Sequence, residues 1–305
     1  MRFNQSLKSV NHRNQRGFTL VEMIVVMVIT GILSGMIVML IKGPVQGYVD
    51  SARRAEINDI ADTAMSRITR DVRMALPNSV RVTSGVCNGT GICYYLEYLE
   101  MVAGGRYITD ASSSSCFSEA SMVSPGVGCL TTVGDLGAVS AVLAASAVIS
   151  PQASVYTGVG IATITSSSAV TNGVTLINFG TTTFSPSSAN HFQIVKTPVT
   201  YVCSPAAGGT LRRYWGYGIQ ALQPNGINAS NQLLDSGGAL LANQSSALLA
   251  NHISQCGFHI SNITGVSGQS AILVSMPLTI TQQGVNEQVG ESLSFYSVAQ
   301  VANVP

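Results

Sequence analysis

Hydrophobic residues are concentrated in one long run near the start of the chain. Residues 18–41 make up 24 positions, and Glu22 is the only charged residue among them. As an α-helix this run would extend about 36 Å at ~1.5 Å per residue, which is enough to cross a hydrocarbon core of about 30 Å. The pattern therefore predicts a helix that can span a membrane, with Lys42 at its end.

A second, amphipathic pattern follows Gly43-Pro44. Apolar residues recur at spacings of mostly three and four, which is the period of one helix face. We therefore expect one helix from about Phe18 to Ala75, with a soft point at Pro44 because proline removes a backbone donor. The apolar stripe consists of Val49, Ala52, Ile57, Ile60, Ala64, Ile68, Val72 and Ala75.

Charged residues occupy the opposite face of this amphipathic segment. Two pairs fall four residues apart and can attract each other weakly: Asp50 with Arg54, and Arg67 with Asp71. Both pairs belong to the face opposite the apolar stripe.

The rest of the chain contains short strand-like runs separated by glycine and proline. Pro198 is expected to separate two strands, and Pro277 to mark a sheet edge or a bulge. An uncharged run at residues 138–149 is too short and too rich in serine for a second membrane span. Its conformation is left open: a buried helix, a strand and a loop insertion all fit this run. Strands are expected at residues 80–83, 94–102, 191–195, 199–203, 211–215, 253–260, 271–281 and 291–298. The expected fold class is α+β, with the long N-terminal helix packed on an antiparallel β-sheet head domain that carries loop insertions.

The segment before the apolar run is basic. Residues 1–17 carry four lysine or arginine residues and no acid, and a basic flank of this kind stays on the cytoplasmic side. An ordinary secretory signal is cut after its apolar region, at small residues. Here a glycine, Gly17, lies before the apolar run instead. An uncleaved membrane anchor is the alternative, but Glu22 would be costly in a plain anchor.

The junction itself reads Arg16-Gly-Phe-Thr-Leu-Val-Glu22 and resembles the type IV prepilin signature. The resemblance implies that a prepilin peptidase cuts between Gly17 and Phe18, and that the new amine of Phe18 is N-methylated. It implies a single-pass inner-membrane protein that later enters a pilus or a pilus-like filament. The expected domains are a removed leader (1–17), a transmembrane and filament-core helix (18–42), an amphipathic helix (43–77) and a β-rich, disulfide-bearing head (78–305).

Glu22 has a specific role under this resemblance. A carboxylate at bilayer depth costs several kcal/mol unless it is neutralised or paired. Cleavage would create a cation on Phe18, one helical turn away, and the resemblance implies that Glu22 pairs with the amine of a neighbouring subunit. An unpaired buried charge would then drive each incoming subunit into register. The alternative is an interfacial glutamate whose side chain reaches the headgroups.

The body of the chain also resembles a narrower group, the minor pilin-like subunits of the mannose-sensitive haemagglutinin (MSHA) pilus system. J-type minor pseudopilins of type II secretion systems share the same plan, and that function remains an alternative. The resemblance implies a low-abundance subunit in a tip complex that helps to start assembly with other minor pilins and the major pilin. It also implies a periplasmic head that later reaches the surface of a Gram-negative bacterium. Since tip-capping subunits tend to lack the acid at the position of Glu22, we expect this subunit to lie below the extreme tip. The similar segments are residues 43–50, 52–55, 68–73, 75–82, 198–203, 211–218 and 301–305.

Six cysteines follow the apolar run, on the side expected to be exported. An even number in an oxidising compartment indicates disulfides, with 15 possible pairings. A zinc site is the alternative, but the sequence has no Cys-x-x-Cys pair, and only His252 and His259 flank a cysteine. We expect no metal and the pairs Cys87–Cys93, Cys116–Cys129 and Cys203–Cys256.

Charge and motifs narrow the function class. Without the leader, 11 basic residues face 14 acidic ones, and no basic stripe typical of nucleic-acid binding is present. The sequence has no Gly-x-Ser-x-Gly, no His-Glu-x-x-His and no phosphate-binding loop. Carboxylates are sparse after Asp110, which disfavours a glycosidase pair. We therefore expect a structural subunit without enzymatic activity and without a cofactor.

One aromatic stretch keeps a second class open. Arg212-Arg213 precede Tyr214, Trp215 and Tyr217, and aromatic rings beside hydrogen-bond donors suit sugars. A pilus-tip adhesin that binds a surface glycan is therefore an alternative function. The competing interpretation is a strand whose aromatic rings pack in the core and across strands.

Overall fold

The computed structural model describes most of the chain and falls into two units. Contacts separate residues 1–55 from residues 56–305, and each unit is described by itself. The described residues are 17–76, 78–87, 91–107, 127–132, 146–148, 155–158, 161–167, 174–179, 191–264, 270–282 and 291–303.

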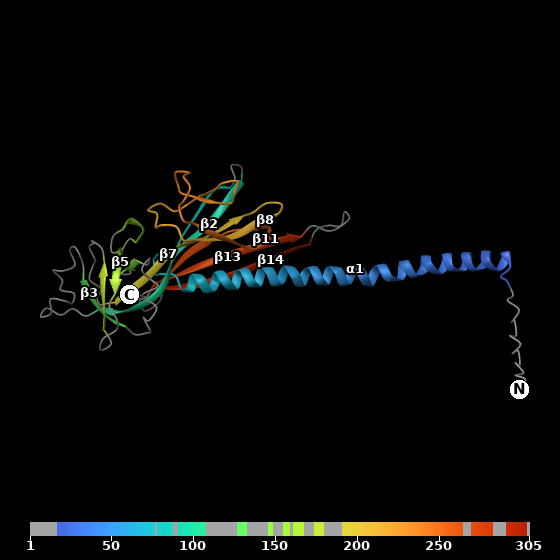
Figure 1. The fold of residues 1–305 in the computed structure, drawn as a ribbon, viewed down its shortest axis with the longest axis horizontal. Coiled ribbons are helices and arrows are strands. Elements are labelled where there is room, and N and C mark those ends of the chain that lie inside the picture. The colour runs from blue at the N-terminus through green and yellow to red at the C-terminus, as the bar shows by residue number, and fades with distance from the viewer. Residues whose placement is uncertain are drawn as a thin grey trace, which may run out of the picture. The chain divides into compact units, whose positions relative to one another are not determined.

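Helix α1 spans Leu20–Arg73 (Figure 1), which confirms the predicted long helix. It begins after Thr19, whose Oγ1 accepts a hydrogen bond from the backbone N–H of Glu22 at 3.3 Å, the usual capping contact of a helix N-terminus. Pro44 lies inside the helix and does not interrupt it. Proline removes a single backbone bond, and the adjoining turns keep theirs.

In the first unit, the described residues from 17 to 52 are all exposed. The apolar part of α1 is long and hydrophobic enough to cross a membrane, and none of its most hydrophobic window is buried. Large apolar side chains such as Met39, at 83% exposure, lie on every side of this segment. A helix that is hydrophobic all round needs lipid or other protein around it.

In its described residues, the second unit is built on a sheet of fourteen strands in the order β10-β9-β1-β2-β3-β6-β5-β4-β7-β8-β11-β13-β12, with β14 beside β13. Neighbouring strands are antiparallel except β1 and β9, which are parallel. This confirms the α+β class with an antiparallel-dominated sheet. The strands are β1 (Arg81–Cys87), β2 (Gly91–Tyr107), β3 (Val127–Thr132), β4 (Ser146–Val148), β5 (Ile161–Ser167), β6 (Val174–Phe179), β7 (His191–Ser204), β8 (Gly209–Trp215), β9 (Gly226–Ile227), β10 (Leu233–Leu234), β11 (Ser245–Cys256), β12 (His259–Thr264), β13 (Ser270–Gln282) and β14 (Glu291–Asn303). A 3-10 helix, η2 (Val155–Thr157), precedes β5.

Two strand boundaries differ from the prediction. Residues 191–204 form one strand, so the expected break at Pro198 is wrong: Pro198 lies opposite Leu99 of β2, next to an irregularity in the pairing that begins at Leu99. A proline fits a strand where the ladder is already disrupted. Conversely, residues 253–260 are not one strand, because Gly257 and Phe258 separate β11 from β12. Of the 138–149 run, the described part is β4.

Pro277 does not mark a sheet edge. β13 pairs with β14 along its whole length without a register shift. On its other side it pairs with β12 up to Ser275 and with β11 from Leu278 onward. Pro277 therefore lies where the partner strand changes, and its carbonyl accepts the N–H of Gly257 at 3.2 Å.

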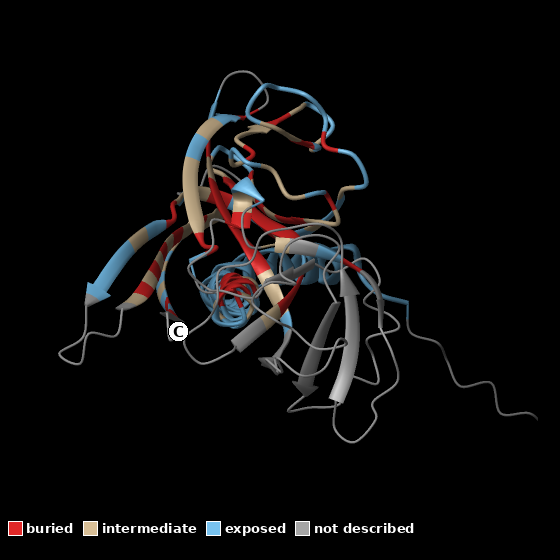
Figure 2. Cartoon of the chain, turned by 90° about the vertical axis from the view of Figure 1, so that its left-hand side faces the viewer, coloured by how far each residue is buried: buried red, intermediate tan, exposed pale blue. Residues whose placement is uncertain are grey.

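The part of α1 that belongs to the second unit, from residue 56 onward, packs on one face of the sheet (Figure 2). Its buried side chains belong to one apolar cluster with core residues of β2, β7, β8, β11, β13 and β14. The predicted stripe is correct from Ile57 onward, but Val49 and Ala52 are exposed, because periodicity does not reveal how far a partner surface extends. The buried helix residues are Ile57, Ala61, Ala64, Met65, Ile68 and Val72.

The opposite face of the sheet carries a second apolar cluster. There Tyr95, Val202 and Tyr214 pack against Tyr217 and residues of β9 and β10. Strands β2, β7 and β8 therefore have buried side chains on both faces, as the alternation of side chains along a strand allows.

Two disulfides join strands in the described residues. Cys87 bonds Cys93 within the β1–β2 hairpin. The bond between Cys203 and Cys256 joins the ends of β7 and β11. Both are pairs named from the sequence. The third expected pair falls outside the described residues, because Cys116 and the side chain of Cys129 are not described.

Gly209 lies between the strands that the second disulfide joins. A Cβ atom at Gly209 would lie 2.3 Å from the carbonyl oxygens of both Ser204 and Ile253. Both contacts are with backbone, which cannot move aside as a flexible side chain can. Only glycine fits the start of β8 here.

We expect Gly209→Ala to destabilise the protein by about 1–3 kcal/mol or more, since overpacking against backbone forces the strands apart. The measurement is urea unfolding of the full chain in detergent, followed by the fluorescence of Trp215, the single tryptophan. Gly218→Ala is the matched control, because nothing lies within 4 Å of a Cβ there. Equal unfolding midpoints for the two variants would contradict this account of Gly209.

Candidate functional site

The expected processing segment lies at the start of the described chain. Gly17, Phe18 and Thr19 precede α1, and all three are exposed, Phe18 by 80%. Glu22 follows in the first helical turn, where the positive end of the helix dipole stabilises a negative charge. Within the described residues of this chain the carboxylate of Glu22 contacts no cation. Residues 1–16 of the expected leader lie outside the described residues.

Asp71 joins α1 to the sheet. Its Oδ2 accepts a hydrogen bond from the hydroxyl of Tyr201 at 2.6 Å and another from Nε of Arg213 at 3.1 Å. Arg67 is farther away, at 3.9 Å. Burial raises the pKa of Tyr201 above its usual range, and the hydrogen bond to Asp71 raises it further, so the hydroxyl stays a donor.

The predicted weak i,i+4 pair is present, with 3.9 Å between Nε of Arg67 and Oδ2 of Asp71. The sequence does not reveal that the side chain of Asp71 is only 13% exposed, or that its closest cation is Arg213. Arg213 lies 142 positions away in the chain, so no local pattern predicts the pair. In the segment of the other predicted pair, Asp50 with Arg54, the structure places Oδ1 of Asp50 3.8 Å from Nη1 of Arg53.

A second buried cluster surrounds Glu97 on β2. Glu97 is fully buried; its Oε2 accepts Nε–H of Arg81 at 2.6 Å, and its Oε1 accepts the hydroxyl of Tyr217 at 3.0 Å. The hydroxyls of Tyr217 and Thr200 share a short hydrogen bond. Burial raises the pKa of Glu97, although the contacts with Arg81 and Tyr217 act in the opposite direction.

Arg81 connects this cluster to the neighbouring loops. It donates to the carbonyls of Gln220 and Ala221 at 2.9 Å each. Its guanidinium also lies 3.5 Å from the ring centre of Tyr156, a cation–π arrangement. The hydroxyl of Tyr156 in turn donates to the carbonyl of Ser79 at 2.6 Å. Arg81 therefore fixes both η2 and the chain after β8 against the sheet.

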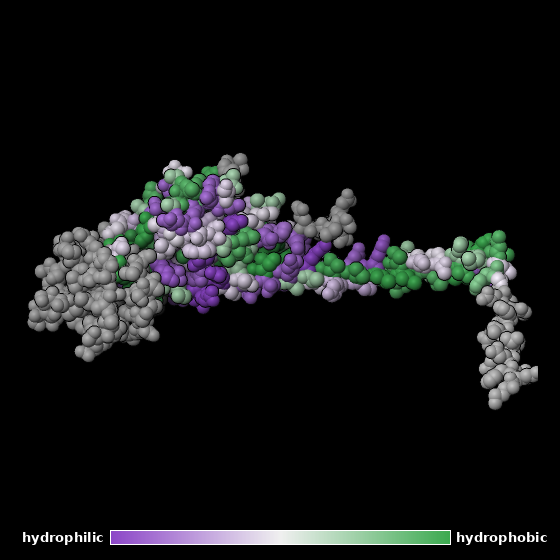
Figure 3. Space-filling model, viewed as in Figure 1, coloured by the Kyte–Doolittle hydropathy of each residue, from purple (hydrophilic) through white to green (hydrophobic). Residues whose placement is uncertain are grey.

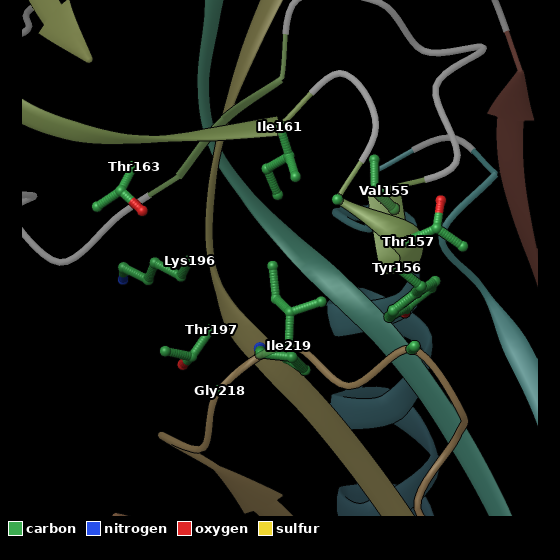
Figure 4. A pocket seen from close by; sticks show the side chains of 12 residues that line it. Val155, Tyr156, Thr157, Ile161, Thr163, Lys196, Thr197, Gly218 and Ile219 are labelled. Atoms are coloured by element: carbon green, nitrogen blue, oxygen red, sulfur yellow. The ribbon is translucent and has the colours of Figure 1, made fainter. Parts of the chain in front are cut away.

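A hollow of about 540 Å³ opens beside Tyr156 (Figure 4). It is lined by η2, by β5, by residues 196–198 of β7 and by residues 218–221. Lys196 is the single charged residue among the described residues that line it, beside neutral side chains such as Thr163. No sequence pattern predicts this hollow, because its lining comes from separate segments of the chain that share no motif.

The aromatic stretch after Arg212 does not form a sugar-stacking surface. Tyr214 and Tyr217 are fully buried. Arg213 donates a hydrogen bond to Asp71, and its guanidinium lies 5.1 Å from the ring centre of Trp215. The competing interpretation, core packing across strands, is the correct one. Glycan binding therefore has no support at this stretch.

The residues considered for zinc do not converge. Cys256 is bonded to Cys203, and both His252 and His259 are exposed. Among the described residues, no group of three potential ligands is close enough to hold a metal ion.

We expect Asp71→Ala to cost about 3 kcal/mol or more in the free energy of unfolding, because it leaves the largely buried Arg213 without its carboxylate. Urea unfolding monitored at Trp215 measures the loss. Asp59→Ala serves as control: Asp59 is an exposed acid on the same helix, where a change of no more than about 0.5 kcal/mol is expected. A similar loss of unfolding free energy in both variants would contradict this role of Asp71.

We expect the stability to depend on pH through Glu97. Because the folded-state pKa is raised above the unfolded value of 4.5, its contribution is largest below pH 4.5 and declines as the pH rises through the folded value. The free energy of unfolding of the wild type should therefore fall relative to Glu97→Gln over this range. A difference between the two proteins that stays constant with pH would contradict the assignment.

A comparison with known protein families agrees with the prediction made for the N-terminal segment. Residues 12–38 match the family model described as the prokaryotic N-terminal methylation motif. No curated protein and no solved structure matches the chain. The matched motif implies processing by a prepilin peptidase and assembly with other pilins, and with the apolar helix it supports membrane anchoring. The motif, the apolar helix and the sheet domain together support a pilin- or pseudopilin-type protein and suggest a structural subunit.

Proposed function

We propose that this chain is a minor pilin-like subunit that helps to start assembly of a type IV pilus of the MSHA kind, as part of a tip complex. The observation that carries the proposal is the N-terminal layout: an exposed Gly17-Phe18 junction, an apolar helical segment at residues 20–41 that is exposed throughout, and one carboxylate, Glu22, in the first turn of α1. The match to the methylation motif covers this region.

The N-terminal residues take specific roles in this proposal. Cleavage after Gly17 leaves an amine on Phe18, which is then N-methylated, and the helix remains in the inner membrane with the head in the periplasm. Glu22 has no cation partner among the described residues of its own chain. In a low-dielectric assembly it pairs with the Phe18 amine of a neighbouring subunit, because an unpaired charge there would be strongly unfavourable.

Features of the head support a minor subunit rather than a bulk pilin. The sheet has fourteen strands and carries two disulfides in its described part. Segments of the sequence, among them residues 68–73 and 211–218, resemble the MSHA subunit MshO. Because Glu22 is present, we place the subunit below the extreme tip, where another subunit follows it.

We expect deletion of the gene to remove surface pili, and Glu22→Ala to fail to restore them in the deletion strain. The variant should still insert and be processed at Gly17, because its apolar helix and its cleavage junction are unchanged. The measurements are electron microscopy of surface filaments and the size of the processed chain. Secretion of exoproteins and attachment to a surface are recorded in the same strains.

Ser34→Ala is the matched control, since it also removes a polar group from the apolar run but no charge; it should restore pili. Normal filament entry of Glu22→Ala would contradict the role of Glu22. Intact pili with lost exoprotein secretion would instead indicate a J-type pseudopilin of a type II secretion system. Intact pili with lost attachment would indicate an adhesin.

A further inference from the structure

β14 has one paired side and one open side. It pairs with β13 over thirteen consecutive positions without a register shift, while β12 and β11 occupy the other side of β13. Within the part of the chain that the structure describes, no strand pairs with the second side of β14. An edge strand presents a row of free backbone N–H and C=O groups, which can template another strand.

The sequence of β14 does not protect this edge. After Glu291, residues 292–303 contain no charge, no proline and no glycine, and the pairing contains no bulge. Proteins normally protect a long edge with a charge, a proline, a bulge or a covering element. An edge without these features is suited to a partner strand.

A groove lies beside β14. This cavity of about 790 Å³ is lined by residues 295–297 of β14 and by both exposed and buried residues of α1 in the second unit. Buried Ala61 and Met65, with the partly buried Phe295, line its apolar part, and Tyr296, at 69% exposure, lies beside them. Thr69 and Ser297 share a hydrogen bond of 3.0 Å that ties β14 to α1.

Positive charge lies near one end of the groove. Arg70 and Arg73 are exposed on the last turn of α1 and line the cavity; Figure 3 shows hydrophilic residues gathered over this end of the helix. Arg70 is 3.9 Å from Asp71, which already accepts from Tyr201 and Arg213. Arg73 forms no ion pair with another described residue. Asp62 also lines the cavity, but it precedes Arg70 by eight residues, about 12 Å along the helix.

We propose that an extended segment of a different pilin-type subunit adds to β14 as a further strand and lies in this groove. Its alternate side chains are apolar where they face Met65 and Phe295, and an aspartate or glutamate contacts Arg70 and Arg73. Backbone hydrogen bonds to β14 give affinity, and the groove and the two arginines give specificity. The proposal rests on the proposed function, because it takes another subunit as the partner.

The test replaces Tyr296 with the photo-crosslinking residue p-benzoylphenylalanine in the full chain, in cells that contain the other pilus subunits. We expect an adduct to a different pilin-type subunit, which mass spectrometry maps to an extended segment that contains Asp or Glu. Val298→Lys, on the exposed side of β14, and Arg73→Glu should each lower the adduct yield about tenfold or more. Disulfide content and urea unfolding of each variant check that it folds, and Arg73→Glu, on an exposed helix face, keeps the test valid if Val298→Lys does not fold.

Val86 supplies the matched control. It is exposed by 57% on β1, which pairs with β2 on one side and β9 on the other, so it offers no open edge. The photo-crosslinking residue at Val86 should give no such adduct, and Val86→Lys should leave the Tyr296 adduct unchanged.

An adduct to a second copy of this chain, to another part of the same chain or to a helical segment would overturn the proposal, as would the absence of any adduct. Failure here and failure of the proposed function are distinguishable. If pili assemble normally but Tyr296 gives no adduct, the strand addition is wrong and the pilus role stands. If the deletion strain still has pili, but the chain that carries the photo-crosslinking residue at Tyr296 forms an adduct with a pilin-type subunit, the pilus role is wrong and the strand addition stands.

Discussion

Helix α1 must satisfy two different surroundings, and the rest of the structure depends on how it does so. In its first part the apolar side chains are exposed on all sides, so lipid or neighbouring protein has to cover them. From Ile57 onward, one face is buried against the sheet. The same secondary structure thus serves a membrane-compatible segment and the core of a folded domain, and only the distribution of apolar residues distinguishes them.

Buried polar groups then fix how the second part of α1 and the loops attach to the sheet. Apolar packing alone tolerates sliding, whereas the contacts of Asp71 with Tyr201 and Arg213 fix one relation between helix and strands. Glu97 and Arg81 do the same for the chain after β8 and for η2. Burying these charges is costly unless every partner is in place. The two clusters therefore favour one position of the helix and loops on the sheet over shifted positions.

The sequence predicts the features that local patterns encode. The apolar run, the amphipathic stripe and the α+β class are visible because helix and strand periodicity are local. The roles of Asp71 and Glu97 are not visible, since partners such as Arg213 and Tyr217 lie far away in the chain. The edge position of β14 is not visible either, because it depends on the order of strands in the sheet. Pro198 and Pro277 were misinterpreted for the same reason: whether a strand tolerates a proline depends on which strands flank it, and that is a property of the sheet.

Two surfaces that the described residues leave uncovered have a common physical logic. A soluble monomer would gain nothing from an all-round apolar helix, and a long unprotected edge strand exposes it to unwanted pairing. Both features become favourable when lipid or another subunit supplies the missing contacts. The apolar helix can be covered by any hydrocarbon-like surface, but the backbone groups of β14 accept only another extended chain. The helix therefore suits a general assembly contact, while the edge is suited to selecting a particular neighbour.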